Sequence, residues 1–431
     1  MSQHLSNPTK KKFSRNFWTV IWMEFFERGS YYGVMSVLSV YLVLSVTEGG
    51  LGFSKESVGV IKSTITPLIY LLPILSGALA DRFGYRKMLF FSFVVMSTGY
   101  ALTSISTSYE LVFLSLLLMA VGAGFFKPLI SGTIARETDE SNSSLGFGIF
   151  YWSINMGAFL FPLILVPYLK ALSWNYIFIM AAVGTGWLVI LNFFVYREPP
   201  KPKNSKTLPQ VFKEIIMVLG DYRFVLMLVI YSCFWILYFQ MFDSVLWYLK
   251  EKMDMTPVNS VVNHFLGWFV SNPSWKFDAE HVTVINALTI IILQLFISAL
   301  VKKKPALPTM IFGISIATLG MALLAVSMNA WVFVAGLFIF SIGEMVAHPK
   351  FLSYIGLTAP PDKKALYLGY SFLYGVIGSG VGGILGATLY VSLVEKNDKP
   401  ALFWLIFVAI GIMTIIGLLI YDRFIARRTN T

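Results

Sequence analysis

The sequence predicts an all-α, polytopic membrane protein with twelve transmembrane helices in two six-helix bundles. Of the 431 residues, 57% are hydrophobic and only 13% are charged, too few charges to cover a soluble protein of this size. The apolar residues form runs of about 20, the length at which a helix crosses a bilayer. A Pro- and Lys-rich stretch separates two sets of runs. Helices are expected because they satisfy their own backbone hydrogen bonds in lipid.

The expected spans follow one another with mostly short connections. They lie at 17–45, 57–80, 88–107, 110–135, 144–170, 174–195, 222–250, 281–301, 308–328, 331–357, 365–393 and 401–422. Several exceed 25 residues, so tilting or protrusion from the bilayer is expected. The chain is therefore expected to be a multi-pass protein of the cell (inner) membrane.

The stretch 196–221 follows the sixth span and is rich in Pro and Lys. We expect a cytoplasmic linker there, between an N-terminal bundle at 1–195 and a C-terminal bundle at 222–431. Two such halves around a midplane site are a common transporter plan. On the opposite side, the long loop 251–280 is expected to form a helix on the membrane surface or over the outer mouth, or to extend the seventh span.

The net charge of +11 is concentrated on one side of the membrane. Threading the spans in order places on the same side the stretches "NPTKKKFSR", "DRFGYRK", "REPPKPKNSK" and "VKKKP". This asymmetry follows the positive-inside rule and predicts cytoplasmic N- and C-termini. It accounts for the basic net charge without a nucleic-acid partner. The expected surroundings of the chain are a lipid bilayer. A monomer is expected.

The first span contains Glu24, Glu27 and Arg28, which are costly in hydrocarbon. Residues at i, i+3 and i+4 share one helix face, so the three side chains project together. That face is predicted to point at an aqueous cavity, where the carboxylates can exchange protons. The alternative is an ion cluster that fixes this helix against a neighbour.

Further charges occur inside other spans. Lys127 and Glu344 are expected near the midplane and Asp243 in the outer third, all facing the same cavity. For Glu344 the alternative is a structural hydrogen bond, and for Asp243 a position in the outer vestibule. Lys62, near an outer helix end, is expected to extend to the interface.

Polar and aromatic side chains at similar depth complete the expected binding site. They are Tyr31, Tyr32, Asn155, Gln240, Asn286, Tyr370 and Tyr374. Each of them taken alone is more often a helix-packing residue than a ligand contact.

Enzymatic chemistry is not expected, because the sequence has no nucleotide-binding, hydrolase or metalloprotease motif. A single cysteine, Cys233, excludes an intramolecular disulfide, and His264 and His281 follow no metal-binding spacing. No metal or cofactor is therefore expected, and an ion gradient is the expected energy source.

The loop "GALADRFGYRK", residues 77–87, resembles the signature between helices 2 and 3 of the major facilitator superfamily. The resemblance implies the major facilitator fold. It also implies a cytoplasmic gate that contains Gly77, Asp81, Arg82, Gly84 and Arg86.

Four further stretches resemble signatures of the proton-dependent oligopeptide transporters within that superfamily. They are "EFFERGSYYG" (24–33), "GAGFFKPLISG" (122–132), "FYWSINMGAF" (150–159) and "GEMVAHPKFLSYIGLTAP" (343–360). Their order along the chain matches the family. Gly29 stands where the family usually has Phe, and the linker is too short for the two extra helices of many bacterial members.

The resemblance implies a role for each matching residue. Proton coupling falls to Glu24, Glu27, Arg28, Lys127 and Glu344. The substrate carboxylate side is assigned to Arg28, Tyr31, Tyr32, Lys127 and Asn155, and the amino-terminal side to Asn286 and Glu344. Tyr370 and Tyr374 occupy binding positions of the family. Gln240 and Asp243 are added to the expected binding site because of their depth in the membrane.

The leading functional hypothesis is a proton-coupled symporter that imports small zwitterionic solutes, most simply di- and tripeptides, by alternating access. A second hypothesis keeps the fold and makes the protein a proton-coupled antiporter that exports drugs or amphipathic metabolites. A third is a receptor or scaffold that binds ligand without transport.

Overall fold

The computed structural model describes residues 12–139, 142–198 and 208–426, and its regular elements there are helices. Their bounds are α1 (Arg15–Met35), α2 (Leu38–Val43), α3 (Lys55–Leu71), α4 (Pro73–Phe83), α5 (Tyr85–Ile105), α6 (Tyr109–Glu137), α7 (Ser143–Leu160), α8 (Val166–Leu172), α9 (Asn175–Gly186), α10 (Leu188–Phe194), α11 (Leu208–Leu219), α12 (Tyr222–Phe239), α13 (Ser244–Lys252), α14 (Thr256–Leu266), α15 (Ala279–Val301), α16 (Ala306–Val326), α17 (Ala330–Thr358), α18 (Lys364–Ser371), α19 (Leu373–Leu389) and α20 (Pro400–Tyr421). Short 3₁₀ or π segments connect several of them, such as Phe161–Leu165 between α7 and α8.

The prediction of an all-helical, multi-pass membrane protein is confirmed. In the described part of the chain, ten helical stretches are long and apolar enough to cross a membrane. The pair α3–α4, bent by 45°, makes an eleventh if the two helices together count as one span. A twelfth span through α1 and α2 stays a prediction, because α1 carries three charged residues in its interior.

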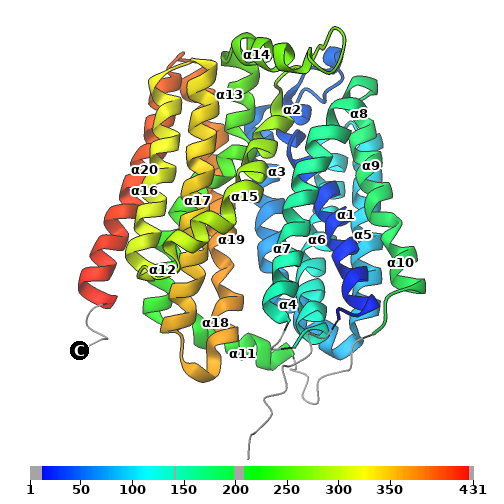
Figure 1. Ribbon diagram of the computed structural model, residues 1–431, viewed down its shortest axis with the longest axis vertical. Coiled ribbons are helices and arrows are strands. Elements are labelled where there is room, and N and C mark those ends of the chain that lie inside the picture. Colours follow the sequence, from blue (N-terminus) through cyan, green and yellow to red (C-terminus); the bar gives the residue numbers. More distant parts are fainter. Residues whose placement is uncertain (1–11, 140–141, 199–207, 427–431) are drawn as a thin grey trace, which may run out of the picture.

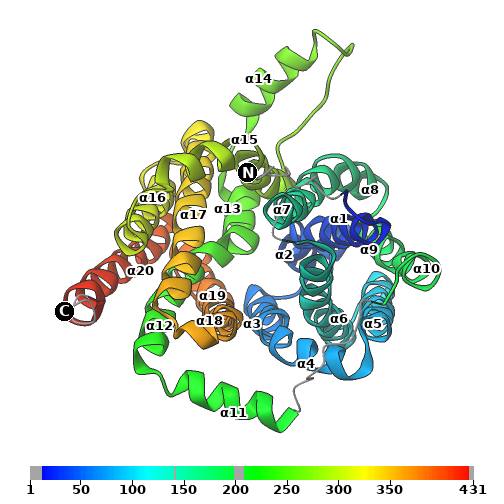
Figure 2. The ribbon, with the colours of Figure 1, turned by 60° about the horizontal axis from the view of Figure 1, so that its bottom comes forward.

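The helices form two groups that stand side by side, as Figure 2 shows. We call α1–α10 the N-terminal group and α12–α20 the C-terminal group. The linker helix α11 runs across one end of the molecule, at the bottom of Figure 1, and α14 lies at the opposite end. We call these the linker end and the loop end. Residues 199–207 of the expected linker lie outside the described residues.

Small residues allow close helix packing inside the groups. A Cβ atom added to Gly343 of α17 would lie 2.4 Å from the backbone nitrogen of Ala317 in α16. Such close approach is typical of membrane helices, which associate through packing of small residues. Large apolar side chains remain exposed on the outside of the groups, among them Phe194, Leu295 and Val326. That surface suits contact with lipid tails.

Candidate functional site: a cavity between the two helix groups

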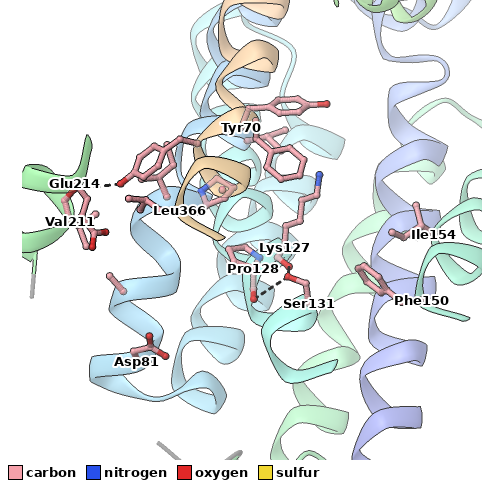
Figure 3. Close-up of a pocket in the computed structure, with 17 residues that line it drawn as sticks. Tyr70, Asp81, Lys127, Pro128, Ser131, Phe150, Ile154, Val211, Glu214 and Leu366 are labelled. Atoms are coloured by element: carbon pink, nitrogen blue, oxygen red, sulfur yellow. Dashed lines mark hydrogen bonds between the residues drawn. The ribbon is translucent and has the colours of Figure 1, made fainter. Parts of the chain in front are cut away.

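A cavity of about 540 Å³ lies between the two helix groups. Helices α3, α4, α6 and α7 line it on one side and α18 on the other, and α11 contributes Val211 and Glu214. Figure 3 shows Lys127 and Tyr70 at one end of the group of lining residues and Asp81, near the end of α4, at the other. The cavity therefore runs from the middle of the molecule to the linker end.

A second, smaller cavity of about 60 Å³ adjoins the first. Arg28, Tyr31 and Tyr32 of α1 line it, together with Lys62 of α3. Lys127 lines both cavities. Arg28 and Lys127 therefore line one cavity, together with a third cation, Lys62.

The charged cluster of α1 is buried and internally paired. The Arg28 guanidinium donates to both oxygens of Glu27, at 2.5 and 2.6 Å, and lies 3.8 Å from Glu24. The guanidinium also lies over the Tyr31 ring, 4.8 Å from its centroid. Among the described residues, one oxygen of Glu24 has no hydrogen-bond partner. Of the three charged residues, Arg28 lines the small cavity, and the ion pairs given above lie within α1 itself.

Lys127 lies where the two helix groups meet. Its ammonium nitrogen is 5.6 Å from the ring centroid of Tyr70 and 5.1 Å from that of Phe372. Phe372 belongs to the C-terminal group, between α18 and α19. Lys127 also lies within electrostatic range of Arg28, Glu24 and Glu27. Lys127 therefore lies close to both the acidic residues of α1 and the C-terminal helix group.

Glu344 of α17 accepts a hydrogen bond from Asn286 of α15 at 2.8 Å, and Asn286 also donates to Ser341 at 3.0 Å. Glu344 lies within electrostatic range of Tyr32 and Tyr70, although it lines neither of the two cavities above. That Glu344 and Arg28 share one chamber therefore stays a prediction.

The other expected binding residues have mixed surroundings. Gln240 donates to the carbonyls of Ile236 and Gly382 and accepts from Ser244, so its amide is fully engaged in helix packing. Asn155 donates to the Tyr151 carbonyl of its own helix. Tyr374 stacks on Trp235 at 4.3 Å between centroids, and Tyr370 lines the large cavity.

The expectation that Lys62 extends to the membrane interface is wrong. Lys62 is buried, and its ammonium lies 3.1 Å from the Asp243 carboxylate. Asp243 also accepts from the Ser39 hydroxyl at 2.5 Å. Asp243 lies at the break between α12 and α13, so the carboxylate sits in a buried contact between the helix groups. The sequence signal for this ion pair was that Lys62 and Asp243 are opposite charges, each without a charged neighbour in its own expected span.

Further contacts join the groups at the loop end. Lys55 pairs with Glu251 at 2.6 Å and with Glu395, and Lys170 pairs with Asp278 and Glu280 at 2.9 and 2.7 Å. A Cβ atom added to Gly59 of α3 would lie 2.6 Å from the Ala387 side chain of α19. The loop end is therefore closed by ion pairs and tight helix packing, and the lysines in it were missed by the sequence analysis.

The residues of the expected gate lie at the linker end and bond within the N-terminal group. Asp81 pairs with Arg136 at 2.9 Å, and Arg86 donates to the carbonyls of Asn192 and Phe193. Gly84 adopts φ = 100°, a conformation that favours glycine. The other two members make looser contacts. Arg82 lies over the ring of Phe83, and the space around Gly77 is open.

The sequence of this chain is similar to those of known transporters. A model of the Major Facilitator Superfamily matches residues 18–275 and 258–430. A di-/tripeptide transporter of Lactococcus lactis subsp. lactis is 32% identical over 216 residues, 46% of this chain and 44% of that protein. Dipeptide and tripeptide permease A of Proteus mirabilis is 30% identical over 197 residues, 44% of this chain and 39% of that protein. The matched region spans less than half of these relatives.

The fold is shared with solved structures over nearly the whole chain. The crystal structure of peptide transporter POT in complex with sulfate superposes with a TM-score of 0.78 at 21% identity, covering 96% of each chain. A POT family transporter in complex with 5-aminolevulinic acid gives the same score and identity, covering 96% of this chain and 98% of that one.

Proposed function

This chain belongs to the major facilitator superfamily, whose members are transporters and not enzymes, and from that premise we propose that it is a proton-coupled symporter. It imports small zwitterionic solutes, most simply di- or tripeptides, by alternating access. Its twelve spans form bundles at 1–195 and 222–431 in the cell inner membrane. The linker end and both termini are cytoplasmic. The energy source is the proton gradient.

The observation that carries this proposal is that Arg28 and Lys127 line one cavity between the two helix groups. Two cations on one wall suit the carboxylate of a zwitterion. On the opposite group, Glu344 with Asn286 supplies an acceptor for the amino end. A substrate with separated charges would thus bridge the two groups.

Proton coupling follows from competition for the same cations. In the structure, Arg28 pairs with Glu27 and lies near Glu24. A substrate carboxylate that binds Arg28 and Lys127 weakens their hold on these glutamates. A carboxylate in low dielectric that loses its cationic partner favours its neutral form. Substrate binding and proton binding on α1 would therefore support each other.

The conformation fits one stage of such a cycle. The loop end is closed by buried contacts such as Lys62–Asp243, whereas the large cavity runs toward the linker end. With the linker end in the cytoplasm, this is the inward-facing stage. Release of the Lys62–Asp243 pair would accompany the outward-facing stage.

The relatives support the choice of peptides. Both are named for di- and tripeptide transport, and each matches less than half of this chain. The solved neighbours share its fold at 21% identity. Peptides are therefore the first substrates to test.

The test is uptake of labelled di- and tripeptides into proteoliposomes with an imposed inward proton gradient. Glu24→Gln and Glu344→Gln are expected to abolish gradient-driven uptake, while exchange of internal for external substrate survives at least in part. Glu110→Gln, at an exposed glutamate in the first turn of α6, is the matched control and should behave like the wild type. Unchanged gradient-driven uptake in both buried-site variants would refute the coupling.

An antiporter is the second candidate, favoured by the apolar part of the large cavity. Ile69, Ile74, Phe150 and Leu366 line it, which suits an amphipathic cargo. Everted vesicles separate the two: proton-dependent accumulation of an amphipathic cation, with no peptide uptake in right-side-out vesicles, would favour export.

A further inference from the structure

The loop between α13 and α15 carries a cluster of exposed apolar side chains, whose aromatic rings contact one another. Val261, Phe265, Trp268 and Phe269 are all more than half exposed, and Trp268 and Phe269 reach 70% and 72%. These residues lie on α14 and in the segment directly after it. We call them the α14 tip. Clustered exposed aromatic residues mark an interaction surface.

The helix α14 projects sideways from the rest of the molecule. It lies at the loop end in Figure 1, and in Figure 2 it extends beyond the ring of helices. It is separate from α13, so the expectation of a simple extension of the seventh span is wrong. Because it points away from the space between the two groups, it does not cover the mouth of the site.

One apolar stripe runs along α14 and is covered at only one end. Val258, near the start of the helix, is buried, and Val262 packs against the core. Val261 and Phe265 lie on the same side of the helix, since residues three and four apart are neighbours, but they are exposed. The apolar stripe packs on the protein around Val258. Farther along α14, the same side of the helix extends past the protein and is exposed.

Hydrogen bonds fix α14 to the segment that returns from the tip to α15. Asn263 exchanges two hydrogen bonds of 2.8 Å with the backbone of Trp275, and Asn259 accepts from the Phe277 backbone at 2.7 Å. These amides fasten the returning segment to α14. The segment then leads into Asp278, which caps α15.

The apolar surface continues from the tip onto the spanning helices. α14 packs against α17, whose exposed Trp331 lies in its first turn. Val326 and Met328, at the adjacent end of α16, are also exposed. Both helices are long and apolar enough to cross a membrane, and Trp331 lies at the end of its span. Trp and other aromatic residues are enriched at that boundary.

We infer that the α14 tip is a membrane anchor that inserts Phe265, Trp268 and Phe269 into the interfacial layer of the leaflet at the loop end. A bilayer is the occupant because it continues the apolar surface of α16 and α17 around the molecule. The opposite side of α14, which carries exposed Ser260, faces water. The anchor lies between Lys250 of α13 and Asp278, the N-cap of α15, and these two residues pair at 3.1 Å.

Spin labels report the depth of each side of α14 directly. Cys233 is the only cysteine, so Cys233→Ser gives a background without cysteine. Phe265→Cys and the matched control Ser260→Cys are labelled with a nitroxide in phosphatidylcholine–phosphatidylglycerol vesicles. Collisions with oxygen, which prefers lipid, are compared with collisions with a water-soluble nickel chelate. We expect oxygen to exceed nickel several-fold at 265 and the reverse at 260.

A second measurement leaves Phe265 in place. In nanodiscs of brominated phosphatidylcholine, the fraction of tryptophan fluorescence that is quenched should fall in Trp268→Phe relative to the wild type. Nickel-accessible labels at both positions together with unchanged quenching would overturn the inference. Strong dipolar coupling between labels at 265 of two molecules would overturn it as well, because the tip would then bind a second copy.

Discussion

The two helix groups meet differently at the two ends of the same pair of spans. At the loop end, α3 and α19 pack so closely that a side chain at Gly59 would collide with Ala387. At the linker end, their continuations α4 and α18 face each other across the cavity, with Ile74 and Asp81 opposite Leu366. The 45° bend between α3 and α4 separates the two regimes. Contact at one end and separation at the other are what alternating access requires of a single conformation.

The largest expected effect breaks the closed end at its buried ion pair. Asp243→Asn leaves the Lys62 ammonium buried without its counter-charge, which costs about 3–5 kcal/mol. We expect a large fall in the midpoint of thermal unfolding of the purified protein. The double variant Lys62→Met, Asp243→Asn should recover much of that loss, because the unpaired charge is gone. An additive double variant would show that the pair does not hold the loop end.

The next effect opens the closed end by steric pressure. Gly59→Val places a side chain against Ala387 and the Gly383 carbonyl, and overpacking of this kind costs about 1–3 kcal/mol. We expect slower uptake and greater labelling of Thr66→Cys, in the cysteine-free background, by an impermeant maleimide added at the loop end. Thr66 lines the small central cavity. Gly148→Val is the control, because none of the described residues lies within 4 Å of its added Cβ atom.

A smaller effect concerns Asp278, outside the spans. Partial burial would raise its pKa, but Lys170 and Lys250 outweigh this and lower the pKa below its usual value. A depressed folded-state pKa adds stability above the unfolded value of about 3.9, and this stability is lost as the pH falls through the folded pKa. Asp278→Asn should therefore cost about 1 kcal/mol at pH 7, and the difference from the wild type should shrink below about pH 4. A difference that grew on acidification would contradict the assignment.

The smallest effect is expected at the open end. Asp81 and Arg136 form a partly exposed pair within one helix group, so Asp81→Asn should change the free energy of unfolding by only about 0.2–0.5 kcal/mol. Thermal unfolding beside Asp243→Asn measures the contrast. A larger loss for Asp81→Asn than for Asp243→Asn would reverse the assignment of closed and open ends.

The fold was predictable because hydrophobic runs record where helices lie, and all ten long apolar helices coincide with expected spans. The shared face of Glu24, Glu27 and Arg28 followed from helical periodicity alone. The pairing of Lys62 with Asp243 did not follow from periodicity, because the relative depth of α3 and α12 depends on packing between the helix groups. Gln240 illustrates the same limit: its partner Gly382 lies 142 positions away. The break of the second span at Leu72 was also missed.

The linker helix α11 touches both helix groups. It packs against α4 on one side and against α12 and α18 on the other, and Tyr370 of α18 donates to its Val211 carbonyl. Its 12 residues form a strut about 18 Å long. Val211 and Glu214 also line the cavity. The part of the cavity wall that α11 forms therefore moves with whichever helix group moves. A compound that fixed α11 to α4 would therefore stop the transporter from changing conformation, although it would bind at the periphery and not in the central cavity.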